Sequence, residues 1–203
     1  MNQKQHMLAV ETPHHVNRAK KIAHEIESYF QGSQQHILEF NCGNGLLASL
    51  LQHRITTGEL IDPSSEQVLL TEKRLVDQHQ TQFKVTQAHI ETHQSTQRYQ
   101  MIYAALTLHQ INDIKATLSH CYELLAPNGK LIIVELLPDD GTFYQDTPLE
   151  KSYHGFEMDV LEAHLKTAGF EQTMARKFFS GYKPLNDGTK HPYSLFSVQA
   201  IKS

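Results

Sequence analysis

The chain has 203 residues, of which 39% are hydrophobic and 20% are charged, which suits one globular domain with a sizeable core. Its formal net charge of −4 gives no electrostatic basis for binding nucleic acid. No window approaches the roughly 18 consecutive apolar residues of a membrane span, and the N-terminus lacks the apolar core of a signal peptide. Two cysteines, Cys42 and Cys121, match no metal spacing, and we expect free thiols in a reducing cytoplasm.

The first part of the chain predicts a helix and then two strands that flank a shorter helix. Apolar residues at spacings of three and four predict an amphipathic helix over residues 14–31. Short apolar runs predict strands at 36–40 and 58–62, with the short helix at 45–52 between them. The only dense basic run lies inside the first helix and is interpreted as a solvated face: Arg18-Ala-Lys20-Lys21.

The middle of the chain continues the alternation of helix and strand. Ser64 begins a helix with a capping box to Gln67. The residues expected on its buried side are Val68, Leu69, Leu75 and Val76. Residues 82–87 predict a weaker strand and residues 100–106 a strong one. The next helix is capped by Asn112 or Asp113 and buries Ile114, Leu118, Cys121, Leu124 and Leu125.

The last part of the chain begins with a turn at 126–129 and a continuous apolar run at 130–136, typical of a strand covered on both faces. Residues 137–155 show no strong periodicity, and a helix at 157–168 ends at Gly169. Two final strands, 171–179 and 193–202, are joined by a bend too short for a crossover helix, so they should pair antiparallel. The predicted fold class is α/β: a Rossmann-like, doubly wound sheet of seven strands, mostly parallel with an antiparallel last strand.

The stretch ILEFNCGNGLLA, residues 37–48, spans the end of the first strand, where open parallel sheets bind ligands. Gly43 and Gly45 allow a sharp turn and the close approach of a ligand. Asp62, at the end of the second strand, can accept both hydrogen bonds of a ribose diol. The simpler interpretations are a plain turn for the glycines and a helix cap for Asp62. Their combination with Glu39 favours a nucleoside ligand.

Glu39 discriminates between two kinds of nucleoside ligand. The dinucleotide pattern G-x-G-x-x-G needs a third glycine, and Ala48 takes its place here, as the looser form of the pattern allows. A carboxylate beneath the turn would repel a pyrophosphate and suits a ligand with an ammonium group. S-adenosylmethionine carries a ribose, an ammonium and a sulfonium but no phosphate, so it fits better than a dinucleotide.

Five stretches of the sequence resemble, in order, class I S-adenosylmethionine-dependent methyltransferases of the small type allied to quinone-biosynthesis methyltransferases. They are ILEFNCGNG for strand one, LIDPSSEQVL for strand two, YQMIYAALTLHQINDI for strand four, LLAPNGKLIIVEL before strand five, and HGFEMDVLEAHLKTAGF for a late helix. The resemblance covers about residues 36–202, and the combination is more specific than any single stretch.

The resemblance implies a role for each matching residue. Glu39 helps to hold the methionine end of the cofactor, and Asp62, with Pro63 beside it, takes the ribose hydroxyls. The backbone around Ala104 and Ala105 closes over the methionine amine. The adenine faces Gln87 and Ala88. The cradle is formed by Asn41, Cys42, Gly43, Asn44 and Gly45.

Three positions depart from the family pattern. Asn41 replaces the usual glycine before Cys42, which tightens the cradle. Asn128 replaces the first glycine of the turn before strand five, where asparagine tolerates a left-handed conformation. Gln87 stands where aspartate is commoner, so its contact with the adenine amine lacks charge.

The sequence contains 14 histidines, and one of them ends the strand-four stretch near the expected methyl acceptor. This residue, His109, is the candidate catalytic base, and the alternative is a packing or pocket-lining role. His89 and His93 are four residues apart, but no third ligand accompanies them, so we expect a solvated turn and no metal site.

The sequence therefore predicts one methyltransferase domain over residues 1–203. Residues 1–35 form an N-terminal helical cover, and residues 36–203 form the S-adenosylmethionine-binding core. Methyl transfer goes to a small-molecule acceptor and yields S-adenosylhomocysteine. The acceptor should contact helix 14–31, the turn around His109 and segment 137–155, with Tyr144, Tyr153 and His154. The alternatives are a non-catalytic S-adenosylmethionine-binding or partner-binding module on this fold, and a nucleotide-dependent oxidoreductase.

Overall fold

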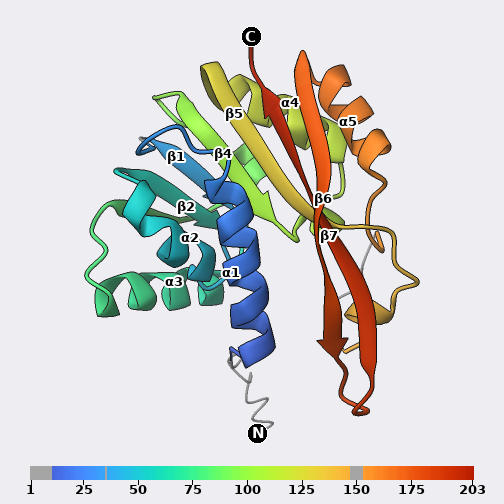
Figure 1. The fold of residues 1–203 in the computed structure, drawn as a ribbon. Helices are drawn as coiled ribbons and strands as arrows, with labels where there is room; N and C mark the ends of the chain where they lie inside the picture. The colour runs from blue at the N-terminus through green and yellow to red at the C-terminus, as the bar shows by residue number, and fades with distance from the viewer. Residues whose placement is uncertain (1–10, 35, 147–152) are drawn as a thin grey trace, which may run out of the picture.

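The computed structural model describes residues 11–34, 36–146 and 153–203, and within them seven strands form one sheet in the order β3-β2-β1-β4-β5-β7-β6 (Figure 1). The strands are β1 (Ile37–Phe40), β2 (Gly58–Asp62), β3 (Phe83–Gln87), β4 (Tyr99–Ala105), β5 (Leu125–Leu136), β6 (Gln172–Pro184) and β7 (Lys190–Ile201). β1 to β5 pair parallel, and β7 runs antiparallel between β5 and β6. The predicted fold class, including the antiparallel last strand, is confirmed.

The α-helices of the described residues cover both faces of the sheet. They are α1 (Pro13–Glu27), α2 (Leu46–Leu51), α3 (Ser65–Asp77), α4 (Ile114–Leu124) and α5 (Met158–Thr167). Along β4, Met101 and Tyr103 pack with α1, whereas Ile102 and Ala104 pack with α4. Because both faces are buried, the central strands are mostly apolar, and Glu39 on β1 and Glu135 on β5 are buried exceptions. None of these helices combines the length and hydrophobicity needed to cross a bilayer.

The C-terminal half of α1 is fixed to the sheet by a buried carboxylate. Glu25 Oε1 accepts hydrogen bonds from Ser197 Oγ at 2.5 Å, Arg176 Nε at 2.7 Å and Tyr29 Oη at 3.1 Å. Ile22, Ala23 and Ile26 are buried beside it. α1 ends at Glu27, four residues earlier than predicted, and the following segment still buries Tyr29 and Phe30. This end of α1 is thus held by polar and apolar contacts together.

The prediction of which α3 residues are buried is partly wrong. Leu69 and Val76 are 65% and 72% exposed, and the buried residues are Val68, Thr71 and Leu75. These three are spaced by three and four residues, as one helix face requires. The polar Thr71 interrupts the apolar pattern, so the stripe was not visible in the hydrophobic residues alone. The predicted N-cap is confirmed, because Ser64 Oγ accepts from Gln67 N at 3.3 Å.

The residues predicted as a turn, 126–129, lie inside β5 as an irregular excursion between Leu125, which pairs with Tyr99, and Lys130, which pairs with Met101. Asn128 has a φ of 61°, and the register shifts between Tyr99 and Met101 on the paired strand. A left-handed asparagine therefore makes an irregularity in a strand instead of ending the helix before it. At α4 the predicted cap is confirmed, with Asp113 Oδ1 accepting from Ala116 N at 2.9 Å.

Candidate active site

The turn between β1 and α2 contains three left-handed residues. Asn41, Gly43 and Gly45 have φ values of 51°, 57° and 72°. A Cβ on Gly45 would lie 2.8 Å from Cγ2 of Thr71, whereas a Cβ on Gly43 would meet nothing closer than 3.9 Å. Gly45 is therefore required for packing against α3, and Gly43 leaves open space in front of the turn.

Glu39 places a carboxyl group beneath this turn. Its side chain is 3% exposed and accepts a hydrogen bond from Tyr103 Oη at 3.0 Å. Burial raises the pKa of Glu39 to about 8; the charge of Asp62 adds to the shift, and hydrogen bonds from Tyr103 and the Ala48 amide oppose it. A cationic ligand next to Glu39 would reverse much of this shift, because an opposite charge favours the ionised carboxylate.

Asp62 connects the end of β2 to the glycine turn. Its Oδ2 accepts from Gly43 N and its Oδ1 from Ser64 N, each at 2.9 Å. Burial raises the pKa of Asp62, and these two amides oppose the shift. The residue is 6% exposed, so it is buried although it stands at a strand end. Each carboxylate oxygen keeps a further lone pair with which to accept a ligand hydroxyl.

A cavity of about 300 Å³ opens between the glycine turn and α1. Its lining includes six of the residues predicted from the sequence: Glu39, Asn41, Cys42, Gly43, Asn44 and Ala105. The lining also includes His15 and Arg18 from the helix predicted at 14–31, and Glu11 and Leu106, which the sequence did not single out. Leu106 follows β4 with a φ of 54°, an uncommon conformation for a leucine and one often found at functional sites.

The other predicted cofactor residues lie outside this cavity lining. Ala88 N donates to Asp62 O at 3.1 Å, and Gln87 Nε2 donates to Pro63 O at 3.1 Å, so these four residues form one edge beyond β2. Ala104 is fully buried and packs with the α4 side of the core. Gly45 is covered by Thr71, as described above.

His109 lies in a 3₁₀-helix, η3 (Leu108–Gln110), and is 3% exposed. Its Nδ1 lies 3.1 Å from Tyr144 Oη, and the two rings are 4.6 Å apart. Glu135, on β5, orders the preceding backbone, because its Oε1 accepts from Thr107 N and Leu108 N at 2.7 Å each. The sequence signal for Glu135 was a lone carboxylate within the apolar run KLIIVEL.

A family model described as a methyltransferase domain matches residues 14–179. The chain belongs to this family of methyltransferase domains. A curated relative, malonyl-[acyl-carrier protein] O-methyltransferase 1 of Ilyobacter polytropus, is 28% identical over 116 residues. That match covers 55% of this chain and 42% of the relative, so the chain spans less than half the length of the relative.

Solved structures share the fold of this methyltransferase domain. YcgJ of Bacillus subtilis matches with a TM-score of 0.71 at 12% identity, over 92% of this chain and 98% of YcgJ. The N-methyltransferase NodS of Bradyrhizobium japonicum, solved with S-adenosylhomocysteine, matches with a TM-score of 0.66 at 14% identity. It aligns over 95% of this chain and 89% of NodS. At such identities the likeness shows the fold alone.

The basic run in the first helix of the methyltransferase domain does not form a uniformly solvated face. Lys20 and Lys21 are exposed as predicted, but Arg18 is partly buried and lines the cavity. Arg18 precedes Ile22 by four residues and Ile26 by eight, so all three lie on the face that packs on the sheet. That spacing was the signal that could have distinguished Arg18 from the two lysines.

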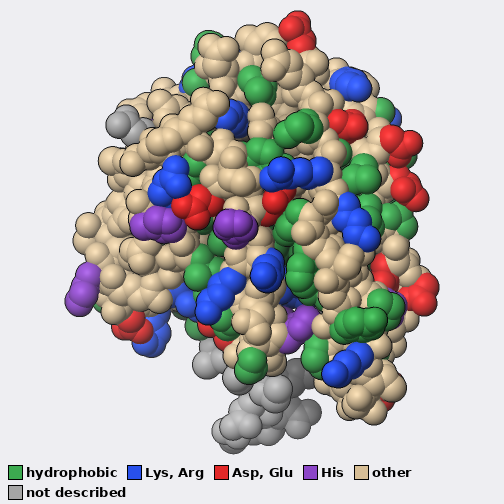
Figure 2. Space-filling model, in the orientation of Figure 1, with side chains coloured by type: hydrophobic (Ala, Val, Ile, Leu, Met, Phe, Trp, Pro, Cys, Tyr) green, Lys and Arg blue, Asp and Glu red, His purple; other side chains and the backbone are tan. Residues whose placement is uncertain are grey.

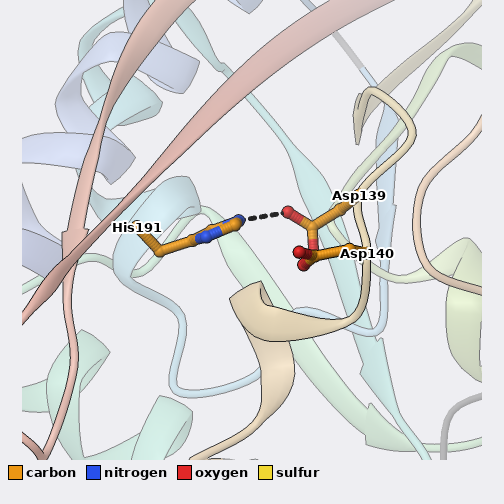
Figure 3. Close-up of side chains that lie close together, drawn as sticks. All are labelled: Asp139, Asp140 and His191. Carbon is orange, nitrogen blue, oxygen red and sulfur yellow. Dashed lines mark hydrogen bonds and ion pairs between the residues drawn. The ribbon is translucent and has the colours of Figure 1, made fainter.

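Asp139, Asp140 and His191 lie close together where β5 leaves the sheet (Figure 3). His191 Nε2 is 2.5 Å from Asp139 Oδ2, while Asp139 Oδ1 accepts from Gly141 N and Phe143 N. Asp140 Oδ1 accepts from Thr142 N. These bonds order a further 3₁₀-helix, η4 (Thr142–Tyr144), so the group has a structural role that needs no ion. Residues 147–152 of the predicted acceptor segment lie outside the described residues.

His89 is exposed, as the predicted solvated turn requires, but His93 is not. His93 is 6% exposed, and its Nε2 lies 2.8 Å from Tyr99 Oη. Tyr99 Oη in turn donates to Glu59 Oε2 at 2.7 Å. His93 is therefore part of a buried polar network that includes β2 and β4.

Proposed function

We propose that this methyltransferase domain binds S-adenosylmethionine and transfers its methyl group to a small-molecule acceptor, with S-adenosylhomocysteine as product. The observation that carries the proposal is the buried Glu39 carboxyl, which faces a cavity beside a glycine turn. A carboxylate there suits the ammonium of the methionine moiety and opposes the pyrophosphate of a dinucleotide. NodS, which shares the fold, was solved with S-adenosylhomocysteine, and this supports the proposal.

Each predicted cofactor residue has a role in this proposal. Glu39 holds the methionine ammonium, with backbone around Ala104 and Ala105 on its other side. The cradle of Asn41, Cys42, Gly43, Asn44 and Gly45 surrounds the chain between sulfur and ribose. Asp62 and Pro63 hold the ribose. The carbonyl oxygen of Gln87 accepts from the adenine amine, because its amide nitrogen already donates to Pro63, and Ala88 packs beside the ring.

Methyl transfer requires the protein mainly to align the cofactor and the acceptor. The bound cofactor supplies a methyl group on a positively charged sulfur, open to in-line displacement by the acceptor. Glu39, Asp62 and the glycine turn fix the position of that methyl group, and Ile22, Ala19 and Leu106 exclude water from the cavity. His109 is proposed to line the acceptor side and to act as a base only where the pKa of the acceptor requires one.

The acceptor is proposed to be a small molecule. The relative from Ilyobacter polytropus is named for O-methylation of a malonyl group on acyl-carrier protein, which supports an acceptor with a small reactive end. The net charge of −4 argues against nucleic acid. We also propose a cytoplasmic location, which is supported by Cys42 and Cys121 being free, buried thiols.

Calorimetric titration with S-adenosylhomocysteine, NAD and NADP tests the proposed cofactor. We expect the wild-type protein to bind S-adenosylhomocysteine and neither dinucleotide. Asp62→Asn keeps an oxygen for one of the two turn amides and turns an NH2 group toward the other. It should weaken binding at least about tenfold, or about 1.4 kcal/mol, through the lost charged acceptor. The matched control is Asp159→Asn, which removes an exposed carboxylate on α5.

Two outcomes contradict the proposal. Equal affinities for wild type and a well-folded Asp62→Asn variant would remove the ribose assignment. Wild-type protein that binds NAD but not S-adenosylhomocysteine would replace methyl transfer with a nucleotide-dependent redox activity. Circular dichroism of each variant separates these outcomes from loss of folding.

A further inference from the structure

Tyr103 is a buried phenol on β4 that faces the carboxyl group of Glu39. The two residues are in register on neighbouring parallel strands, so their side chains leave the same face of the sheet. Tyr103 Oη donates to Glu39 Oε2 at 3.0 Å. The ring belongs to the apolar core beneath α1, together with Ile22 and Ile26. Phenylalanine would supply the same ring to this core, so packing alone does not account for the hydroxyl.

The cavity beside the glycine turn reaches Glu39 but not Tyr103. Among the described residues, the lining contains Glu39, whereas Tyr103 lies behind it in the core. A carboxylate has about four lone-pair positions, and the Tyr103 hydroxyl and the Ala48 amide occupy two of them. The remaining positions can accept hydrogen bonds from a group in the cavity. Tyr103 therefore acts on a ligand in the cavity through Glu39.

A second buried pair of tyrosine and glutamate has a different environment. Tyr29 Oη lies 3.1 Å from Glu25 Oε1, and the same oxygen accepts from Arg176 Nε at 2.7 Å. Glu25 thus has a cation from the chain, and neither member of this pair lines the cavity. In the part of the chain that the structure describes, no ion pair within 4.0 Å joins Glu39 to a cation. A ligand in the cavity can supply the cation that Glu39 lacks.

Other titratable groups also surround Glu39. Lys, Arg and His side chains gather over the helix that Figure 1 labels α1, and some of them reach the cavity (Figure 2). On the sheet side, the charge of Asp62 on β2 raises the pKa of Glu39 in addition to the effect of burial. A Glu39→Gln variant keeps all these neighbours, so it isolates the titration of Glu39 itself. The remaining neighbours, from the glycine turn and from the α1 side of the cavity, are Cys42, Glu11, His15 and Arg18.

We propose that Tyr103 is a positioning residue for the cofactor, whose hydroxyl holds Glu39 in the orientation in which its carboxylate meets the ammonium of the methionine moiety. Burial raises the pKa of Glu39, and the hydrogen bond from Tyr103 opposes that shift. Without the hydroxyl, the carboxylate is free to turn and forms only at a higher pH, so it binds the ammonium less well at neutral pH. The inference rests on the proposed function, because it concerns cofactor binding at that same site.

Calorimetry with two ligands tests whether Tyr103 acts at the methionine end. Wild type, Tyr103→Phe and the matched control Tyr29→Phe are titrated with S-adenosylhomocysteine and with 5′-methylthioadenosine, which lacks the amino-acid end. We expect Tyr103→Phe to lose about tenfold in affinity for S-adenosylhomocysteine and to bind 5′-methylthioadenosine like wild type. Tyr29→Phe should match wild type for both ligands. An equal loss for both ligands in Tyr103→Phe, or the same loss in Tyr29→Phe, would indicate a general effect on the fold and overturn the proposal.

A pH series and a double variant test whether the effect passes through Glu39. Affinity for S-adenosylhomocysteine should rise with pH in wild type and in Tyr103→Phe, and it should level off at a higher pH in Tyr103→Phe. Glu39→Gln and the double variant with Tyr103→Phe should have similar affinities and lack this pH dependence. The proposal is wrong if Tyr103→Phe keeps the wild-type pH profile, or if it weakens Glu39→Gln as much as it weakens wild type. If wild type does not bind S-adenosylhomocysteine, the proposed function fails instead.

Discussion

Glu39 and Glu135 are two buried carboxylates in similar sequence contexts with different surroundings. Each stands in an apolar run of a parallel strand, and their side chains are 3% and 1% exposed. Glu135 accepts hydrogen bonds from the backbone amides of Thr107 and Leu108, at 2.7 Å each. Glu39 accepts from the Tyr103 phenol and faces the cavity. Glu135 therefore orders the protein's own backbone, whereas Glu39 faces the cavity in which we propose that a ligand binds.

The comparison shows what a carboxylate in an apolar strand does and does not predict. Burying such a group is unfavourable without compensation, so a hydrogen-bond donor or a cation must be near. Whether that partner belongs to the chain or to a ligand depends on the loops that reach the strand end. Strand pattern alone cannot distinguish the two cases.

The largest expected effect is a loss of stability when the Glu135 carboxylate is removed. Glu135→Ala leaves two buried amides without their acceptor, each worth about 1–3 kcal/mol, so the free energy of unfolding should fall by about 2–6 kcal/mol. Glu135→Gln keeps a carbonyl acceptor and should lose less. Urea denaturation monitored by circular dichroism measures both. A loss below about 1 kcal/mol in Glu135→Ala would show that the carboxylate is not structural.

For Glu39→Gln we expect little change in stability but a clear loss of ligand affinity. The neutral amide removes a buried ionisable group but cannot pair with an ammonium, so stability should change by less than about 1 kcal/mol. Affinity for S-adenosylhomocysteine should fall at least about tenfold, or about 1.4 kcal/mol. Urea denaturation measures the change in stability, and calorimetry on the same samples measures the change in affinity. A Glu39→Gln variant that unfolds readily yet binds normally would give Glu39 the role assigned to Glu135.

A further expected effect is a pH dependence to which Glu39 contributes, together with Asp62, whose pKa burial also raises. The folded protein without ligand has a Glu39 pKa of about 8, well above the ordinary value of 4.5, so it keeps a proton that the unfolded chain loses. Stability from this group is therefore present below pH 4.5 and is lost as the pH rises towards about 8.

Ligand binding should respond to pH in the opposite direction. An ammonium requires the carboxylate, so affinity for S-adenosylhomocysteine should rise with pH, by at most about tenfold per unit, and level off near pH 8. Calorimetry from pH 6 to pH 8 measures the slope, and Glu39→Gln serves as the control. Equal slopes in the two proteins would mean that another group titrates.

The sequence predicted most of the sheet because its strands are apolar on both faces and its helices are amphipathic. It failed where polar residues occupy core positions, as Thr71 does in α3, and where a left-handed Asn128 sits inside a strand. The glycine turn and Glu39 were found because their chemistry is unusual at a strand end. Arg18 was missed because the sequence interpretation treated the whole basic run as one solvated face. The burial of each residue in the run depends instead on the helix face on which it lies.

The anchoring of α1 by Glu25 has a consequence for the order in which the protein is assembled during synthesis. Its partners Arg176 and Ser197 lie 151 and 172 residues further along the chain. The helix that closes the cavity is thus made first, but its docking site is complete only after β6 and β7 have left the ribosome. Until then α1 can pack only on earlier strands such as β4, without its polar partners on β6 and β7. Contacts of such long sequence separation form late and favour slow folding.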